Sequence, residues 1–388
     1  MALPFQYSFR NLWVRRATTF ATVTGIALVV FVLAATLMLA AGVRGTLSSA
    51  GRPDRAIVMQ GDAYSEGDSR MRQAVIGIVG AAPGVLHDKE GKPLVTGETV
   101  VHVYLQNARD TSDIASVQVR GVMSNVFQVR DDVRIIEGRL PKSGTDEAIV
   151  GKALLGKYQG LTLNGGFELQ KKRSVKIVGV FSAGGSAYES EVWADLDAVR
   201  ASFGFQGYFS SITARLQSPQ SFDAFAIPLR ADKRQGLGVE RERAYYEKVS
   251  EGLSHLITGL GSVVAFIFSF GALLGAAITM YGAVSQRVRE IGVLKALGFS
   301  RADVLLAVLL ESTLIALVGG GLGALLALLT PLVDFSAINY ATGQQLVFRF
   351  VPNVSILCWA LGSGALVGVL GGFFPALRAA SVSPTQVL

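Results

Sequence analysis

Charged residues and cysteines are both scarce in this sequence, and each scarcity excludes a class of protein. Of the 388 residues only 17% are charged and 50% are hydrophobic, and the mean hydropathy is +0.43. A chain this apolar is not an ordinary soluble domain, so part of it must lie in lipid. The single cysteine, Cys358, lies within an apolar run, which excludes an intrachain disulfide and a cysteine-based zinc site.

Sequence motifs for catalysis are also missing. No Gly-x-x-x-x-Gly-Lys-Ser/Thr loop occurs, which excludes a P-loop ATP site, and no Gly-x-Ser-x-Gly turn marks a serine hydrolase. The histidines, His87, His102 and His255, lack the spacing of metal ligands. We therefore predict that the chain is not itself an enzyme and binds no metal or cofactor of its own.

Four long apolar runs are present instead, and each is about 20 residues or longer, enough to cross a bilayer. We expect transmembrane helices at residues 17–43, 256–285, 303–330 and 354–374. Basic residues precede the first run, separate the second from the third and follow the fourth. The positive-inside rule then places both termini, including the tail 375–388, in the cytoplasm, and the net charge of +7 favours anionic lipid headgroups over nucleic acid as its partner.

The segments 44–238 and 331–353 are then external, and the first has the composition of a water-soluble domain. Alternating apolar and polar residues predict strands at 99–105, 117–122, 174–181 and 211–216. Helical periodicity predicts helices at 71–79 and after Asp195, which has the character of an N-cap. We expect a membrane α-helical protein with four transmembrane helices and an external α+β domain of two lobes.

A heptad pattern leads into the second apolar run. Its apolar residues alternate steps of three and four: Tyr246, Val249, Leu253, Leu256, Leu260 and Val263. We interpret residues 239–285 as one stalk helix that continues into the membrane and packs on the extension of the first span or on a second copy of the chain. The alternative is an ordinary core-facing helix of the external domain.

Three smaller patterns complete the membrane part. Residues 1–16 have the spacing of an amphipathic helix at the inner interface or, alternatively, of an aromatic anchor. Small residues recur four apart in every span, which predicts close helix packing: Ala21, Gly25, Gly271, Gly275, Gly319, Gly323, Gly364, Gly368 and Gly372. Glu311 is the ionisable residue inside a span, where a carboxylate needs a partner. Either the side chain extends along the lipid to the interface or it has a partner on the first span, where the candidates are Thr18, Thr19, Thr22 and Thr24. We favour a structural hydrogen bond over a proton-coupling role.

The sequence resembles the FtsX/MacB family of ABC transporter permeases, most specifically at residues 286–300, QRVREIGVLKALGFS, and at 305–312. The two ends of the chain are similar to the same family. The external stretches 119–122, 137–139 and 147–150 are similar to the MacB-type periplasmic core domain.

This resemblance implies a permease of the cell inner membrane that works as a dimer with two copies of an ABC ATPase, which binds the ATP and Mg²⁺. A homodimer is favoured over a heterodimer. The cytoplasmic loop 286–302 would carry a coupling helix that docks on the ATPase, through residues Arg287, Arg289, Glu290, Ile291, Val293, Leu294, Lys295, Gly298 and Phe299. Closure of the ATPase would move the external domain through the stalk, which is mechanotransmission.

The chain starts shortly before its first interfacial segment, so we expect the ATPase to be a separate polypeptide. The leading hypothesis is export or extrusion of a substrate, with a periplasmic adaptor and an outer-membrane duct as candidate partners. Two alternatives remain open. One is an FtsX-like signalling scaffold that activates a cell-wall hydrolase, and the other is a lipoprotein-releasing permease.

Overall fold

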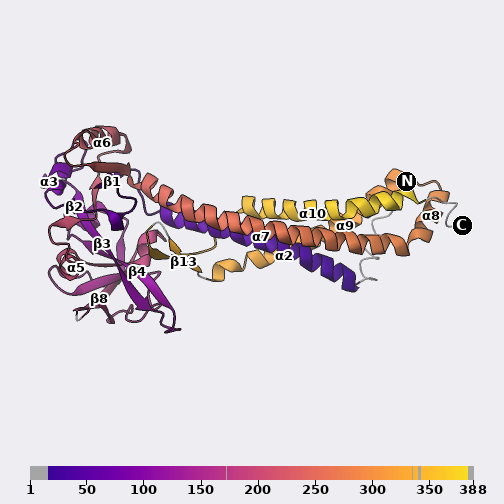
Figure 1. The fold of residues 1–388 in the computed structure, drawn as a ribbon, viewed down its shortest axis with the longest axis horizontal. Coiled ribbons are helices and arrows are strands. Elements are labelled where there is room, and N and C mark those ends of the chain that lie inside the picture. The colour runs from indigo at the N-terminus through magenta and orange to yellow at the C-terminus, as the bar shows by residue number, and fades with distance from the viewer. Residues whose placement is uncertain (1–15, 172, 334, 340–341, 383–388) are drawn as a thin grey trace. The chain divides into compact units, whose positions relative to one another are not determined.

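The computed structural model describes residues 16–171, 173–333, 335–339 and 342–382 (Figure 1). The predicted interfacial segment 1–16 and the end of the predicted tail thus lie almost wholly outside the described residues. The chain divides into two compact units. The helical unit comprises Met1–Ala41, His255–Val333 and Arg349–Leu388, and the α/β unit comprises Gly42–Ser254 and Asp334–Phe348. The chain therefore passes between the units four times.

Within the described residues, the helical unit contains four helices that are long and apolar enough to cross a membrane, as the sequence predicts. Their bounds are α2 (Arg16–Ser48), α7 (Glu242–Gln286), α9 (Arg301–Ala327) and α10 (Val354–Ser381). Two short elements complete the connections, α8 (Val288–Ala296) between α7 and α9, and η4 (Thr330–Leu332) after α9. In the α/β unit, α2 ends and α7 begins.

Small residues bring α2, α9 and α10 into backbone contact. A Cβ added at Gly319 would lie 2.7 Å from the carbonyl oxygen of Val23, and one at Gly323 would lie 2.3 Å from that of Ala27. A Cβ at Gly368 would lie 2.2 Å from the Cβ of Ala316. No larger side chain fits at Gly319, Gly323 or Gly368, which explains the packing role predicted for them.

The α/β unit is built on a ten-stranded mixed sheet in the order β12-β1-β11-β3-β4-β9-β6-β8-β5, with β7 also paired to β8. The strands are β1 (Arg55–Gln60), β3 (Val95–Gln106), β4 (Ile114–Val122), β5 (Arg134–Gly138), β6 (Glu147–Gly151), β7 (Gly166–Gln170), β8 (Arg173–Ser182), β9 (Glu191–Asp195), β11 (Ser211–Arg215) and β12 (Leu237–Arg241). Most neighbours are antiparallel, while β4 with β9 and β6 with β8 are parallel.

Short helices and two small antiparallel strand pairs complete this unit. The helices are α3 (Val75–Gly80), α4 (Val126–Val129), α5 (Leu196–Phe203), α6 (Phe222–Ala231), η1 (Glu66–Asp68), η2 (Ala187–Ser190) and η3 (Pro219–Ser221). The two small antiparallel pairs are β2 (Met71–Arg72) with β10 (Tyr208–Phe209), and β13 (Phe335–Asn339) with β14 (Gln344–Phe348). Asp195 is the N-cap of α5, as predicted, since its Oδ1 accepts from the amide of Ala198 at 3.0 Å.

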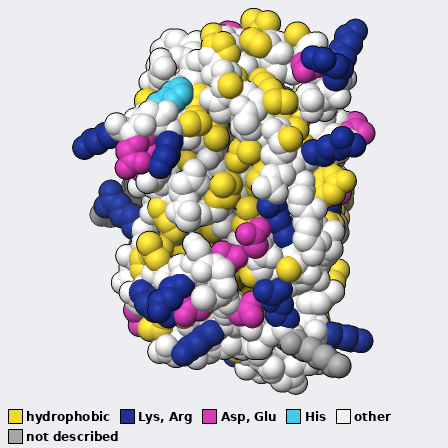
Figure 2. Space-filling view, turned by 90° about the vertical axis from the view of Figure 1, so that its left-hand side faces the viewer, with side chains coloured by type: hydrophobic (Ala, Val, Ile, Leu, Met, Phe, Trp, Pro, Cys, Tyr) yellow, Lys and Arg dark blue, Asp and Glu magenta, His cyan; other side chains and the backbone are white. Residues whose placement is uncertain are grey.

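Two apolar cores lie against the one sheet and correspond to the two predicted lobes. Val119 and Ile177 belong to the core around β4 and β8, and Ile212 and Phe225 belong to the core between β11 and α6. On the face shown in Figure 2, apolar side chains form a band through the middle and Lys and Arg side chains lie mainly at the edge.

Three predicted boundaries differ from the structure. Met71 pairs with Phe209 in the β2–β10 ladder, so the helix predicted at 71–79 begins only at Val75. Residues 239–241 belong to β12, because Val239 pairs with Val58 of β1, and the stalk helix begins at Glu242. The segment 331–353 is more than a link between spans, since it contains the β13–β14 hairpin of the α/β unit.

Candidate functional site

The turn after α8 ends the helix at the residue that the sequence predicts. Gly298 has φ +96°, its amide donates to the carbonyl oxygen of Lys295 at 3.1 Å, and the amide of Phe299 donates to that of Leu294 at 3.2 Å. These two bonds form a Schellman motif. Its residue in the left-handed conformation is usually glycine, as it is here. A capping box between Ser300 and Asp303, which the sequence analysis overlooked, then starts α9.

One face of α8 is turned toward its own chain. Ile291 is 7% exposed and belongs to an apolar cluster with Val284 of α7, Val304 of α9 and Ala379 of α10. The sequence predicts that Ile291 contacts the ATPase, and in this chain its side chain packs against three other helices.

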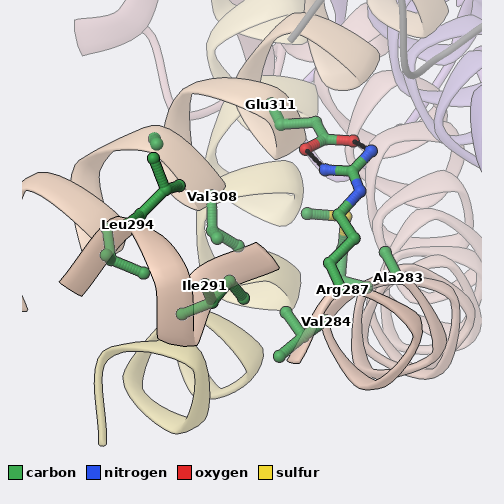
Figure 3. Close-up of a pocket in the computed structure, with 10 residues that line it drawn as sticks. Ala283, Val284, Arg287, Ile291, Leu294, Val308 and Glu311 are labelled. Carbon is green, nitrogen blue, oxygen red and sulfur yellow. Dashed lines mark hydrogen bonds and ion pairs between the residues drawn. The ribbon is translucent and has the colours of Figure 1, made fainter. Parts of the chain in front are cut away.

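Arg287, the N-cap residue of α8, also faces inward and pairs with Glu311 of α9 (Figure 3). The two Nη–Oε distances are 2.9 and 3.5 Å, and the side chains are 16% and 10% exposed. The predicted threonine partner of Glu311 is therefore wrong: Thr22 hydrogen-bonds instead to Thr279 at 3.0 Å. A cavity of about 40 Å³ adjoins the ion pair, enough for a few water molecules.

Lys295 makes the third inward attachment. Its Nζ donates to the carbonyl oxygen of Val382 at 2.7 Å and to that of Ala380. An ammonium group at the carboxyl end of α10 satisfies carbonyls that lack a helical partner and opposes the negative end of the helix dipole. Lys295 thus holds α8 on α10, whereas the sequence analysis placed it among the residues that contact the ATPase.

The opposite face of α8 is exposed in the part of the chain that the structure describes. Arg289, Val293 and Leu297 recur four residues apart and form one exposed stripe, which we call the docking stripe. Val293 is 45% and Leu297 73% exposed. Leu297 lies four residues after Val293 and is not among the coupling residues predicted from the sequence. Glu290 is also exposed, and Leu294 and Phe299 are half-buried.

The six residues of the heptad pattern, which we call the seam, are divided between the two units. Tyr246, Val249 and Leu253 are buried in the α/β unit, as in the alternative interpretation of a core-facing helix. The other three residues, Leu256, Leu260 and Val263, are 47%, 63% and 59% exposed. In the helical unit α7 contacts α2 through other residues, since a Cβ at Gly261 would lie 1.9 Å from the Cγ2 of Thr36.

A groove of about 420 Å³ lies between α2 and α7 within the helical unit. Gly25, Gly271 and Gly275 are among its lining residues. A Cβ added at Gly271 or Gly275 would meet no heavy atom of the described residues within 4 Å. These two glycines therefore serve no close packing inside the described part of one chain, unlike Gly319 and Gly323.

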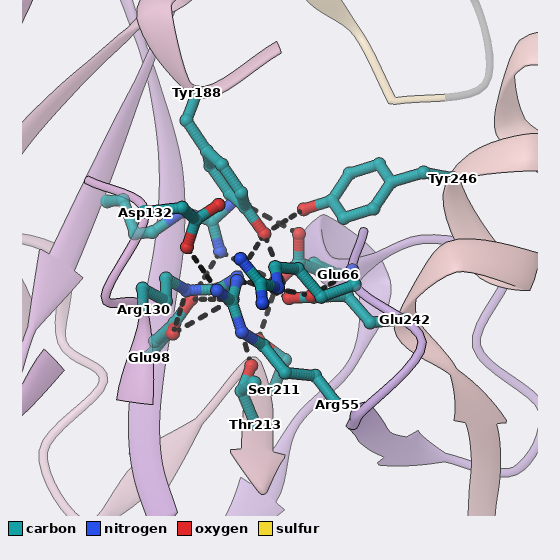
Figure 4. A network of polar contacts seen from close by, with 12 residues as sticks. Arg55, Glu66, Glu98, Arg130, Asp132, Tyr188, Ser211, Thr213, Glu242 and Tyr246 are labelled. Carbon is teal, nitrogen blue, oxygen red and sulfur yellow. Dashed lines mark hydrogen bonds and ion pairs between the residues drawn. The ribbon is translucent and has the colours of Figure 1, made fainter. Parts of the chain in front are cut away.

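A cluster of buried charges surrounds the first turn of α7 in the α/β unit (Figure 4). Its charged members are Arg55, Arg120, Arg130, Glu66, Glu98, Glu191 and Glu242, all at most 5% exposed. We call them the charge cluster. Arg120 donates to Glu191 at 2.7 Å, to Glu66 at 2.8 Å and to Glu98 at 2.6 Å. Buried carboxylates and guanidinium groups are tolerated because each has several such partners.

The charge cluster fixes the stalk helix to the sheet. Glu242, the first residue of α7, accepts from the amide of Arg52 at 3.0 Å and from the hydroxyl of Tyr188 at 3.1 Å, and Arg130 pairs with it as well. Tyr246 donates to the hydroxyl of Tyr188 at 2.8 Å. Burial raises the pKa of both phenols well above their ordinary value. These residues come from distant strands and helices, so no sequence motif marks them.

Comparison with known families matches nearly the whole chain. The family model described as the MacB-like periplasmic core domain matches residues 19–231, and the model described as the FtsX-like permease C-terminal matches residues 262–384. The second match includes α8, Glu311 and the docking stripe. The first match includes most of the charge cluster, although Glu242 lies beyond its end.

Curated relatives carry the same family names. The macrolide export ATP-binding/permease protein MacB 1 of Aeromonas hydrophila is 27% identical over 290 residues, which are 70% of this chain and 43% of that protein. MacB of Shewanella oneidensis is 30% identical over 226 residues, 55% of this chain and 33% of the relative. The chain thus spans less than half the length of these MacB proteins.

Two solved structures are also similar to part of this chain. One is the periplasmic region of MacB from Actinobacillus actinomycetemcomitans, with a TM-score of 0.36 and 12% identity, covering 51% of this chain and 93% of that one. The other is the extracellular domain of the noncanonic ABC-type transporter YknZ from Gram-positive bacteria, with a TM-score of 0.36 and 17% identity, covering 48% and 99%.

Proposed function

Because the chain belongs to the MacB/FtsX family of ABC transporter permeases, we propose that it couples ATP hydrolysis by a separate ATPase subunit to movement of its α/β unit. Mechanotransmission of this kind would serve export or extrusion of a substrate. The ATPase would bind the ATP and Mg²⁺, since the sequence holds no P-loop. In this proposal α8 lies at the cytoplasmic face of the inner membrane and the α/β unit on the outer side.

The observation that carries the proposal is the division of α8 into two faces. Arg287, Ile291 and Lys295 tie its inner face to three neighbouring helices. Apolar Val293 and Leu297 are exposed beside Arg289 on the opposite face of α8. An apolar pair next to an arginine is typical of the centre of a protein interface. A force applied to the docking stripe would therefore pass directly into α7, α9 and α10.

A second copy of the chain is the proposed partner within the membrane. Leu256, Leu260 and Val263 of the seam are exposed, and the groove beside Gly271 and Gly275 is open in one chain. Helices in lipid associate where small residues permit close approach. A homodimer would cover both surfaces at once. On the outer side, the apolar band in Figure 2 is a surface that an adaptor protein could cover.

The docking stripe is tested by counting subunits. The chain is expressed with a candidate ATPase and purified in detergent, and the mass of the particle gives the number of each subunit. We expect two permease and two ATPase chains. The variant Val293→Asp/Leu297→Asp should keep the permease dimer and bind the ATPase at least about 30-fold more weakly, since it places charge in an apolar contact.

Ile136→Asp/Leu140→Asp is the matched control, because both side chains are about as exposed as Val293 but belong to the α/β unit. This control should retain the ATPase. Undiminished ATPase binding by the docking-stripe variant would contradict the proposed coupling site.

A further inference from the structure

The β13–β14 hairpin is an integral part of the α/β unit, although the sequence places it between α9 and α10. Leu346 and Phe348 are fully buried, and Val347 belongs to the same apolar core as Val117 and Val119 of β4. A simple loop between two spans would leave these three consecutive apolar residues exposed, whereas here all three are buried. Its separation from the sheet would expose all three to water.

Two hydrogen bonds join β14 to the last residue of η2. The amide of Val347 donates to the Oγ of Ser190 at 3.1 Å, and the Nε2 of Gln344 donates to the carbonyl oxygen of Ser190 at 3.1 Å. All the groups involved are buried. Breaking this contact would leave buried polar groups unpaired, which is unfavourable beyond the loss of the bonds themselves.

Ser190 lies between two members of the network around the stalk helix. Tyr188 precedes it by two residues and bonds to Glu242, and Glu191 follows it and pairs with Arg120. A cavity of about 20 Å³ is lined by Thr342 and Gln344 on the hairpin side of the chain and by Tyr245 and Tyr246 of α7. The hairpin also contacts α7 directly, since the Nδ2 of Asn339 donates to the carbonyl oxygen of Val249 at 3.5 Å. The hairpin and the stalk helix therefore meet at the same buried charges.

We infer that the β13–β14 hairpin is a second positioning element of the stalk junction. It holds η2 so that Tyr188 and Glu191 meet Glu242 and Arg120, and it moves as one body with the α/β unit. Two of the four passages of the chain between its units are the ends of this hairpin. A displacement of α9 and α10 thus reaches the charge cluster independently of α7. The part played in the ATPase cycle depends on the proposed function.

Hydrogen exchange on the full-length permease in detergent tests the positioning role without any ATPase. Gln344→Ala removes the bond to Ser190, and Gln345→Ala changes the same residue type on the same strand outside that contact. We expect Gln344→Ala to speed exchange about fivefold, both at 188–192 and in the first turn of α7. Gln345→Ala should leave both segments unchanged. Faster exchange confined to 342–348, or equal effects of the two substitutions, would overturn the inference.

A reversible crosslink tests whether the hairpin stays in place during turnover. Ser190→Cys/Val347→Cys, in a Cys358→Ser background, places thiols on two residues whose backbones lie close together, because the Val347 amide donates to the Oγ of Ser190 at 3.1 Å. In the complex with its ATPase, the oxidised form should hydrolyse ATP as fast as the reduced form. A loss of turnover on oxidation that reduction restores would show that the hairpin must separate, contrary to the inference. Should no ATPase bind, the proposed function fails while the exchange result still stands.

Discussion

At the scale of single residues, the ion pair between Arg287 and Glu311 determines how α8 is held. Both side chains are mostly buried, and their two-point contact joins the start of α8 to α9. A buried pair contributes little compared with an apolar pair, but removal of one member leaves the other charge without compensation. The pair therefore favours a fixed α8 and gives Glu311 the structural role that its position in a span leaves open.

We predict that Glu311→Gln lowers the free energy of unfolding by about 3 kcal/mol, because Arg287 remains charged beside an uncharged amide. The double variant Arg287→Gln/Glu311→Gln should recover more than half of that loss. Thermal unfolding of the permease in detergent measures both. Arg289→Gln, on the exposed face of the same helix, should leave the stability unchanged. Equal losses in the single and double variants would show that the two side chains are not coupled.

The sequence singled out Glu311 but not its partner. A carboxylate inside an apolar run can be recognised in the sequence alone. Its partner cannot, because the pairing depends on how α8 packs beside α9. The charge cluster was invisible for a related reason. Arg55, Arg120 and Arg130 lie on separate elements of the domain and resemble ordinary surface arginines until the sheet brings them together.

At the scale of elements, α8 shows what a motif can and cannot predict. The end of the helix at Gly298 follows from local chemistry, since a positive φ is needed there. The division of its residues into inner and outer faces does not. It depends on which helices pack against it, and so the sequence grouped Ile291 and Lys295, which face inward, with the exposed Arg289 and Val293.

Gly298→Ala should fray the end of α8. The glycine has φ +96° and no heavy atom within 4 Å of an added Cβ, so the cost of about 1 kcal/mol arises from the backbone alone. We expect the amides of α8 to exchange about fivefold faster. Gly282→Ala is the matched control, because Gly282 has the same free space but lies within α7. Alanine there should be neutral or stabilising, and an equal effect at both sites would refute the role of the turn.

At the scale of the whole molecule, the sequence predicted the four long helices and the mixed helix and strand content of the external domain correctly, because both depend on periodicity within short windows. It did not predict the β13–β14 hairpin as part of the α/β unit. That assignment depends on Val347 meeting Val117 and Val119, which are more than 200 residues away along the chain. The same long-range packing buries three tyrosines, Tyr188, Tyr245 and Tyr246, beside carboxylates at the start of the stalk helix.

These phenols predict loss of stability in alkali. Burial raises the pKa of all three above their ordinary value near 10. Nearby carboxylates add to this rise, and Arg130 opposes it at Tyr188. A raised folded pKa means that their stabilisation is complete below about pH 10 and is lost as the pH rises further, because the unfolded chain releases protons that the folded chain retains. The free energy of unfolding should then fall by about 1.4 kcal/mol per pH unit for each tyrosine.

Tyrosinate absorbance and unfolding of the full-length permease, followed together from neutral pH into alkali, measure this effect. Of the ten tyrosines, these three should ionise only as the α/β unit unfolds. Tyr246→Phe also removes the bond to Tyr188. Above pH 10 it should make the fall in the free energy of unfolding less steep by about 1.4 kcal/mol per pH unit, the contribution of one tyrosine. Tyr104→Phe, at a side chain that is 74% exposed, should leave that slope unchanged. If all ten phenols ionised before unfolding, the three hydroxyls would not be sealed from solvent, and the junction of stalk helix and sheet would be open rather than closed.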